Sequence, residues 1–240
     1  MDEKLGSIHR DTMSKLKSIF TPFAILVCTA LNAFASVAVS RPVTSGALSV
    51  TMQQEKSLER VATRLLSTAV EKFDDKAYWH ATRELIILLD FYPSFSKTDG
   101  VLYYLGESLY QMEMYNSAAK IFRYMAANYP QSDYLPKTLL SLQKLHYNVQ
   151  EMENSLNYFV GITTRFPDDE VLDGAYYYGG MAYFHQKNYD EAIKALGRVR
   201  SRSEYYDYGL YTVGLSFLKK KHSAIRQSLS QADDFTCPEG

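Results

Sequence analysis

The sequence has few of the residues that build disulfides, metal sites or nucleic-acid surfaces. Cysteine occurs only at Cys28 and Cys237, and the formal net charge is −1, so no broad basic surface is available for nucleic acid. No two of the five histidines stand three or four residues apart, so no metal-binding pair is indicated. No glycine-rich phosphate loop is present, because Gly179-Gly180 lies within a helical pattern. We therefore expect no enzyme activity, no cofactor, no metal and no small-molecule substrate.

Charge is also missing from the N-terminal region between Ser18 and Ser40. Two lysines, Lys15 and Lys17, precede this uncharged run, which contains Ala-Phe-Ala at 33–35. A basic segment, an apolar segment and small residues in this order predict a secretory signal peptide, residues 1–35, cleaved after Ala35.

Two alternatives to cleavage stay open. The apolar run reaches the lower length limit for an uncleaved membrane anchor, and Cys28 is a candidate for lipid modification. Lipid-attachment sites have a small residue before the cysteine, whereas here Val27 precedes Cys28, which argues against lipid modification. Met13 fits the start of a signal peptide better than Met1 does, because the first residues are acidic. After cleavage only Cys237 would remain, which excludes an internal disulfide.

An internal repeat dominates the rest of the chain. Pro93, Pro130 and Pro167 each follow an aromatic residue and stand 37 residues apart. Aligned on these prolines, each copy has a first helical pattern, a short polar break and a second helical pattern. Proline then ends the second helix, because it lacks an N–H and disfavours helix in the residue before it.

Small residues recur where two helices of a copy must approach closely. In the first helices the position is taken by Ala69, Gly106, Gln143 and Gly180, with Gly214 34 residues further on. In the second helices it is taken by Ala81, Ala118, Ser155 and Ala192. Gln143 and Ser155 make the third copy the weakest match.

These offsets resemble the tetratricopeptide repeat. Residues 104–130 and 178–199 carry the resemblance, with a small residue, an aromatic, alanine and a large apolar residue at the family's positions. The resemblance implies an all-α, right-handed superhelical solenoid of antiparallel helical hairpins, about four and a half repeats long. The 37-residue period resembles that of a bacterial subgroup, the Tol–Pal-associated periplasmic proteins and the β-barrel-assembly lipoproteins. Two departures are that Cys28 fits lipidation poorly, and that residues 36–57 are too short for a trimerising coiled coil.

The expected organisation is a signal peptide over 1–35, a linker over 36–57, repeats over 58–232 and an irregular tail over 233–240. We expect "KKKH", residues 219–222, to form the turn of a fifth hairpin. No polar capping helix follows, although repeat arrays usually need one. A truncated coding sequence and an out-of-frame end both account for this.

The family resemblance places the first helix of each repeat along a concave groove, and this chain is rich in tyrosine, with 20 residues. Aromatic side chains offer large contact area at small entropic cost. We expect the groove to bind a protein or peptide partner in a cell-envelope complex, in a periplasmic or secreted, outer-membrane-associated protein. The expected groove residues are Phe73, Tyr103, Glu107, Tyr110, Lys144, Tyr147, Tyr177, Met181, Phe184, His185 and Tyr211.

Three other interpretations stay open. Some of these aromatics pack between helices instead of facing a partner. In the second interpretation, the array serves as a dimerisation or spacer module of a longer protein. In the third, it is an accessory domain of an envelope hydrolase whose catalytic part is absent here.

Overall fold

The computed structural model describes residues 45–234, and the side chains of 53–226 among them. The chain divides at Thr51 into two compact units, and the hairpins and surfaces described below belong to the second, Met52–Gly240. The expected signal peptide, both cysteines and the tail after Asp234 lie outside the described residues.

Helices make up all the regular structure between residues 45 and 234, which confirms the all-α repeat fold. None of these helices is both long and apolar enough to cross a bilayer. The helices are α2 (Ser45–Asp74), α3 (Tyr78–Phe91), α4 (Thr98–Gln111), α5 (Tyr115–Asn128), α6 (Leu135–Asn148), α7 (Met152–Arg165), α8 (Leu172–His185), α9 (Tyr189–Leu196) and α10 (Tyr206–Asp234).

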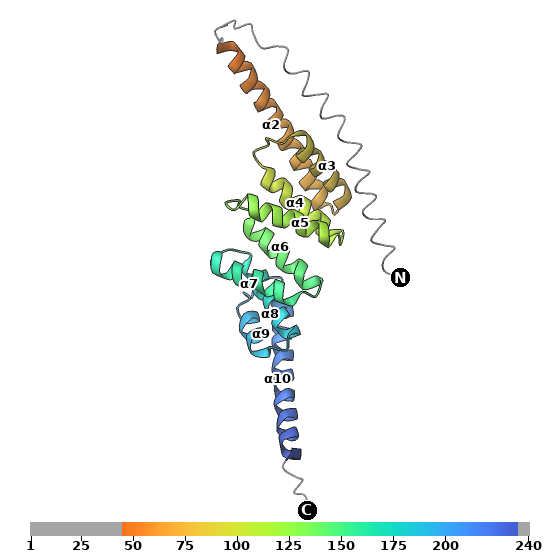
Figure 1. Ribbon diagram of the computed structural model, residues 1–240, viewed down its shortest axis with the longest axis vertical. Helices are drawn as coiled ribbons and strands as arrows, with labels where there is room; N and C mark the ends of the chain where they lie inside the picture. Colours follow the sequence, from red (N-terminus) through yellow and green to blue (C-terminus); the bar gives the residue numbers. More distant parts are fainter. Residues whose placement is uncertain (1–44, 235–240) are drawn as a thin grey trace, which may run out of the picture. The chain divides into compact units, whose positions relative to one another are not determined.

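The helices form hairpins in chain order: α2 with α3, α4 with α5, α6 with α7 and α8 with α9 (Figure 1). Each second helix also packs on the first helix of the next hairpin, as α3 does on α4 and α9 on α10. α10 follows as a single helix. Hence the described residues hold four hairpins and one unpaired first helix.

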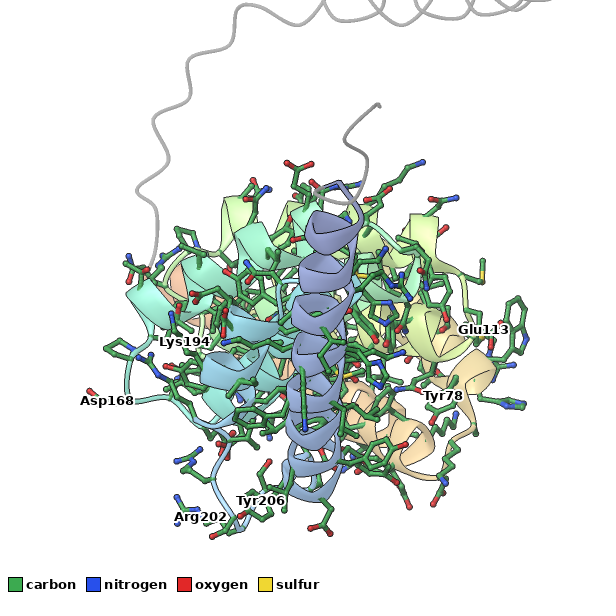
Figure 2. All side chains as sticks on the ribbon, turned by 90° about the horizontal axis from the view of Figure 1, so that it is seen from below. Tyr78, Glu113, Asp168, Lys194, Arg202 and Tyr206 are labelled. Atoms are coloured by element: carbon green, nitrogen blue, oxygen red, sulfur yellow. The ribbon has the colours of Figure 1, made fainter. Side chains whose placement is uncertain are left out.

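Each hairpin turns at a residue in the left-handed region of backbone space. Lys76, Glu113, Gln150 and Lys187 have φ between 60° and 64° and stand 37 residues apart. Two backbone bonds close each turn: Glu113 N–H donates to Tyr110 at 2.9 Å, and Met114 N–H donates to Leu109 at 2.9 Å. This is the Schellman motif, here without its usual glycine. Figure 2 shows Glu113, in one such turn, on the opposite side of the array from Asp168, in a connection between hairpins.

The core is built on the small residues of the repeat. A Cβ on Gly106 would lie 2.4 Å from the Phe122 ring, and one on Gly180 would lie 2.5 Å from Leu196. Ala118 and Ala192, the small residues of the partner helices, are fully buried. The two helices of a hairpin thus meet with a large side chain of one lying over a small residue of the other.

The third hairpin solves the same problem differently. Gln143 takes the small position, is fully buried, and donates to the carbonyl oxygen of Ala175 at 2.9 Å. Phe159, which occupies the large position, lies instead against Gly179 of the next hairpin, where a Cβ would come within 2.6 Å of its ring. Gln143 is larger than the residue usually found at its position, and Gly179 compensates for this by leaving space for the Phe159 ring.

The fifth hairpin expected from the sequence does not form. α10 is continuous from Tyr206 to Asp234, so residues 219–222 are helical and make no turn. Aligned on Gly214, Ser223 takes the aromatic position of the second helix and Arg226 its small position. Without an aromatic and a small residue at these positions, a second helix could not pack against α10. The free-energy cost of a turn would then not be offset. At the other end, α2 begins at Ser45, so residues 45–57 of the expected linker are helical.

Gly106→Ala should destabilise the protein by about 1–3 kcal/mol, because the new methyl group overlaps the Phe122 ring. Gly161→Ala is the matched control, since nothing lies within 4 Å of its Cβ position in α7, and alanine should stabilise that helix by roughly 0.5–1 kcal/mol. Urea unfolding of both variants measures the two effects. Equal effects of the same sign would contradict the packing described here.

Candidate functional site

The residues expected to form a groove lie on the first helices of the hairpins. Tyr103, Glu107 and Tyr110 are spaced four and three residues apart on α4, so they share one helical face. Tyr177 and His185 lie on the equivalent helix α8. We call the face formed by these residues, with Lys144 and Tyr147 of α6 and with Tyr178 of α8, the tyrosine surface.

Two aromatic stacks frame this surface. The Tyr103 ring stacks on Tyr134 with centroids 5.0 Å apart, and the Tyr177 ring stacks on Tyr205 at the same distance. In each stack the neighbouring tyrosine of the first helix, Tyr104 or Tyr178, meets the pair edge-on. Such contacts favour a rigid arrangement of rings over mobile side chains.

The two outer tyrosines of the stacks, Tyr134 and Tyr205, were not expected from the sequence. Both lie in a connection just before a first helix, and both end a Ser-acidic-Tyr triplet. In each triplet the serine oxygen accepts the tyrosine backbone N–H, at 3.1 Å from Ser132 and 3.3 Å from Ser203. The repeated triplet was the signal in the sequence that would have found them.

A polar centre separates the two stacks. The Ser141 hydroxyl of α6 donates to the Glu107 carboxylate of α4. Burial raises the pKa of Glu107, while the Ser141 hydrogen bond and the Lys144 charge oppose that rise. The Lys144 ammonium also lies 5.8 Å from the centre of the Tyr178 ring, within cation–π range. The Glu107 carboxylate and the Lys144 ammonium thus lie between the two aromatic stacks.

A repeated hydrogen bond joins consecutive first helices across this surface. Asn148 of α6 donates its amide to the Tyr110 hydroxyl of α4 at 2.8 Å. One repeat later, the Tyr147 hydroxyl and His185 Nε2 are 3.1 Å apart. Both bonds join residues 38 positions apart in the sequence. They hold the polar tips of the tyrosines in register from α4 to α8.

The other expected residues lie at the margins. Phe73 of α2 packs edge-on against Tyr104 at 5.5 Å, and Phe184 of α8 packs against Tyr189 at 5.7 Å. Met181 accepts the Thr212 hydroxyl on its sulfur at 3.5 Å. Tyr211 of α10 is 68 % exposed. Phe73, Met181 and Phe184 are half-buried and contribute mainly to packing between helices.

Burial of the phenol groups raises their pKa values across the surface. The pKa of Tyr110 rises to about 12, because burial removes water from its hydroxyl and Glu107 adds negative charge nearby. Burial raises the pKa of Tyr103, Tyr178 and Tyr205 in the same direction. At neutral pH these tyrosines are uncharged hydrogen-bonding groups.

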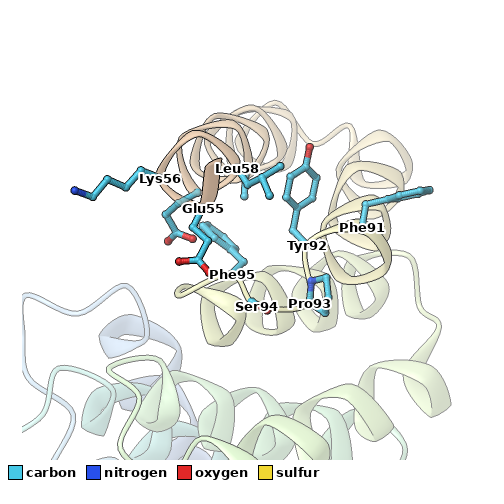
Figure 3. Close-up of a pocket in the computed structure, with 10 residues that line it drawn as sticks. Glu55, Lys56, Leu58, Phe91, Tyr92, Pro93, Ser94 and Phe95 are labelled. Carbon is cyan, nitrogen blue, oxygen red and sulfur yellow. The ribbon is translucent and has the colours of Figure 1, made fainter. Parts of the chain in front are cut away.

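A separate hollow of about 540 Å³ lies between α2 and the connection after α3. Leu58, Ala62, Tyr92, Pro93 and Phe95 supply its apolar lining. Figure 3 shows the rings of Tyr92 and Phe95 beside it, with the Lys56 side chain pointing outward. Across the described part of the chain, no group of three or more His, Cys, Asp or Glu side chains is arranged to hold a metal ion.

Comparison with known proteins agrees with this architecture. The family profile described as "Tetratricopeptide repeat" matches residues 101–132 and 174–203. No curated protein matches the chain in sequence.

Several solved structures share the fold. A crystal structure of MamA aligns with a TM-score of 0.56 at 16 % identity, covering 75 % of this chain and 97 % of that one. MamA residues 41-end from Desulfovibrio magneticus RS-1 align with a TM-score of 0.55 at 15 % identity, covering 72 % and 93 %. YrrB, described as "a TPR protein with an unusual peptide-binding site", aligns with a TM-score of 0.52 at 16 % identity, covering 75 % and 86 %. At such identities the likeness concerns the fold, and the chain carries tetratricopeptide repeats within an array of that fold.

Stability should fall as pH rises from about 10 towards 12, because the buried phenols keep protons that the unfolded chain releases. Their folded-state pKa values lie above the ordinary value of 10.0, and that of Tyr110 is about 12. The stabilisation is therefore complete below pH 10, and it is lost as the pH rises through the folded-state pKa values of these phenols. Urea unfolding between pH 8 and 11.5 measures it, and Tyr110→Phe should reduce the slope. An unchanged slope in this variant would show that the Tyr110 hydroxyl is not buried.

Proposed function

We propose that this protein is a non-enzymatic scaffold that binds an extended segment of a partner protein on the tyrosine surface. The continuity of that surface carries the proposal. Rings from α4, α6 and α8 are held in register by the Tyr110–Asn148 and Tyr147–His185 contacts. A rigid surface spanning three hairpins loses little side-chain entropy when it binds.

The chemistry of the surface favours a segment with apolar or aromatic side chains on either side of a polar one. The Tyr103 and Tyr177 stacks offer ring faces and edges, while Glu107 and Lys144 between them offer one charge of each sign. Tetratricopeptide-repeat proteins bind protein or peptide partners, and YrrB, of similar fold, is described by its peptide-binding site. Binding of this kind uses the side of the array to which the first helices contribute.

We place this function in the bacterial cell envelope. The support is the sequence of Lys15 and Lys17, the uncharged run and Ala33-Phe34-Ala35, together with the 37-residue period. Export after removal of residues 1–35 would bring the repeats to a periplasmic or outer-membrane-associated location.

Tyr110→Ala should weaken peptide binding about thirtyfold, as expected for an anchor worth about 2 kcal/mol. Peptides selected from a displayed random library against the full chain serve as ligands, and fluorescence anisotropy measures their affinity. Urea unfolding of the same variant shows whether the fold survives. Phe122→Ala gives the contrasting pattern, since that buried ring should cost about 3–5 kcal/mol of stability.

Trp79→Ala is the matched surface control. Trp79 is an aromatic residue on α3, 68 % exposed, that is not part of the tyrosine surface. Its removal should leave affinity unchanged. Peptides that lose affinity with Trp79→Ala and keep it with Tyr110→Ala would locate the binding site elsewhere.

N-terminal sequencing of the mature protein from envelope fractions should begin at Ser36, if the small residues before it direct cleavage. An Ala35→Arg variant should accumulate with residues 1–35 attached, because signal peptidases need a small side chain there. An intact N-terminus on protein recovered from the cytoplasm would contradict the envelope location.

A further inference from the structure

α10 exposes an apolar stripe that no other described part of the chain covers. At about 100° per residue, residues 207, 210, 211, 214, 217, 218 and 221 fall on one face of this helix. Leu210, Phe217 and Leu218 are between 57 % and 60 % exposed, and Tyr211 is 68 % exposed. The opposite face carries Thr212 and Ser216, which are buried against the preceding hairpin.

The stripe consists partly of positions that are core elsewhere in the array. Aligning Gly214 with Gly106 places Leu210 at the position of Leu102 and Phe217 at that of Leu109. Leu102, Gly106 and Leu109 are buried in the second hairpin, where Phe122 of α5 lies over Gly106. Nothing lies within 4 Å of a Cβ built on Gly214. α10 therefore offers a helix-binding face that no second helix covers among the described residues.

The order of residues along the stripe is complementary to itself. Rotating a second α10 by half a turn about Gly214 makes the two helices antiparallel and sets residue i beside residue 428 − i. Leu210 then meets Leu218, Tyr211 meets Phe217, and Asp207 meets Lys221. Gly214 meets its own copy, where the absence of a side chain allows the helices to approach closely. A two-fold interface requires this kind of self-complementarity.

Charge supports the antiparallel direction. Asp207 lies in the first turn of α10, before Leu210 and Tyr211, and Lys219, Lys220 and Lys221 follow Phe217 and Leu218. Lys220 is already paired with Asp190 of α9 at 2.5 Å, while Asp207 and Lys221 are exposed on the stripe. A parallel pair would set lysines against lysines, which repel each other across an interface.

We propose that the α10 stripe docks a second copy of this chain, with the two α10 helices antiparallel and crossing at Gly214. Each copy then covers the face of α10 that the described residues of the other copy leave exposed. The residues of this contact all lie on α10, and none of them belongs to the tyrosine surface of α4, α6 and α8. The resulting dimer would present two such surfaces and bind bivalent partners with increased avidity.

Sedimentation equilibrium of the full chain, over about 1–500 µM, tests this contact. We expect a monomer–dimer equilibrium in the wild type. Phe217→Glu should raise the dimer dissociation constant at least about a hundredfold, because it buries a carboxylate against Tyr211 of the second copy. Circular dichroism should show an unchanged melting curve for the monomer, since Phe217 is exposed within one chain.

Tyr208→Glu is the matched control on the same helix. Tyr208 is 69 % exposed but lies about 120° around α10 from the centre of the stripe. This variant should dimerise as the wild type does.

A charge exchange tests the antiparallel register. Asp207→Lys and Lys221→Glu should each weaken dimerisation about tenfold, because each creates two like-charge contacts per dimer. The double variant should restore the wild-type constant, since both contacts again join opposite charges. A protein that is monomeric throughout, a dimer insensitive to Phe217→Glu, or a double variant no better than the single ones would each overturn the proposal.

Discussion

The close approach of two helices at one small residue sets the geometry of the whole array. Where Phe122 lies over Gly106, the helices of the second hairpin come together, and a Schellman turn at Glu113 reverses the chain between them. Glu113 must adopt positive φ without being glycine, which costs roughly a kilocalorie per mole or more. The packing of the two helices of the hairpin offsets this cost. Because turn and contact recur every 37 residues, successive first helices present equivalent faces to the same side.

The tyrosine surface follows from that regular spacing. Tyr110 reaches Asn148, and Tyr147 reaches His185, because equivalent positions of adjacent first helices lie next to each other. The aromatic stacks recur with a longer period, since Tyr103 and Tyr177 are two repeats apart and Leu140 takes the position between them. The middle hairpin supplies polar groups instead, with Ser141 and Lys144 beside Glu107. The surface therefore has two aromatic zones and a charged centre, because the first helices of alternate hairpins carry a stacked tyrosine and the one between them does not.

The last described helix shows what happens when the contact between a large and a small side chain is lost. Arg226 occupies the position where the earlier hairpins have a small residue, and Ser223 replaces the aromatic before it. α10 therefore continues as one helix, and its apolar stripe stays uncovered within the described residues. Local helix propensity favours continuation, because no packing gain remains to offset a strained turn.

Sequence periodicity was enough to predict the hairpins, because the small residues and the prolines report directly on packing and on helix ends. It placed Tyr103, Tyr110 and Tyr147 on the first helices for the same reason. The partners of these side chains were harder to predict. Tyr134 and Tyr205 come from connections, whose path depends on the Ser132 and Ser203 turns and not on helical period.

Two further features needed the structure because they involve neighbouring repeats at once. Gln143 looked like a mismatch within its own copy, and only the position of Phe159 over Gly179 shows how the next hairpin accommodates it. The turn expected at residues 219–222 was wrong, because polarity alone does not reverse a helix when the following residues cannot pack.

Hydroxyl-radical footprinting tests whether peptide binds on the tyrosine surface, because it reports on individual aromatic side chains in the intact protein. The oxidation of each tyrosine and of Trp79 is measured by mass spectrometry with and without a bound peptide. Bound peptide should protect Tyr110 and Tyr147, while Trp79, which is exposed on α3 and is not part of the tyrosine surface, should be oxidised equally in both samples. Protection of Trp79 with unchanged oxidation of Tyr110 and Tyr147 would contradict it.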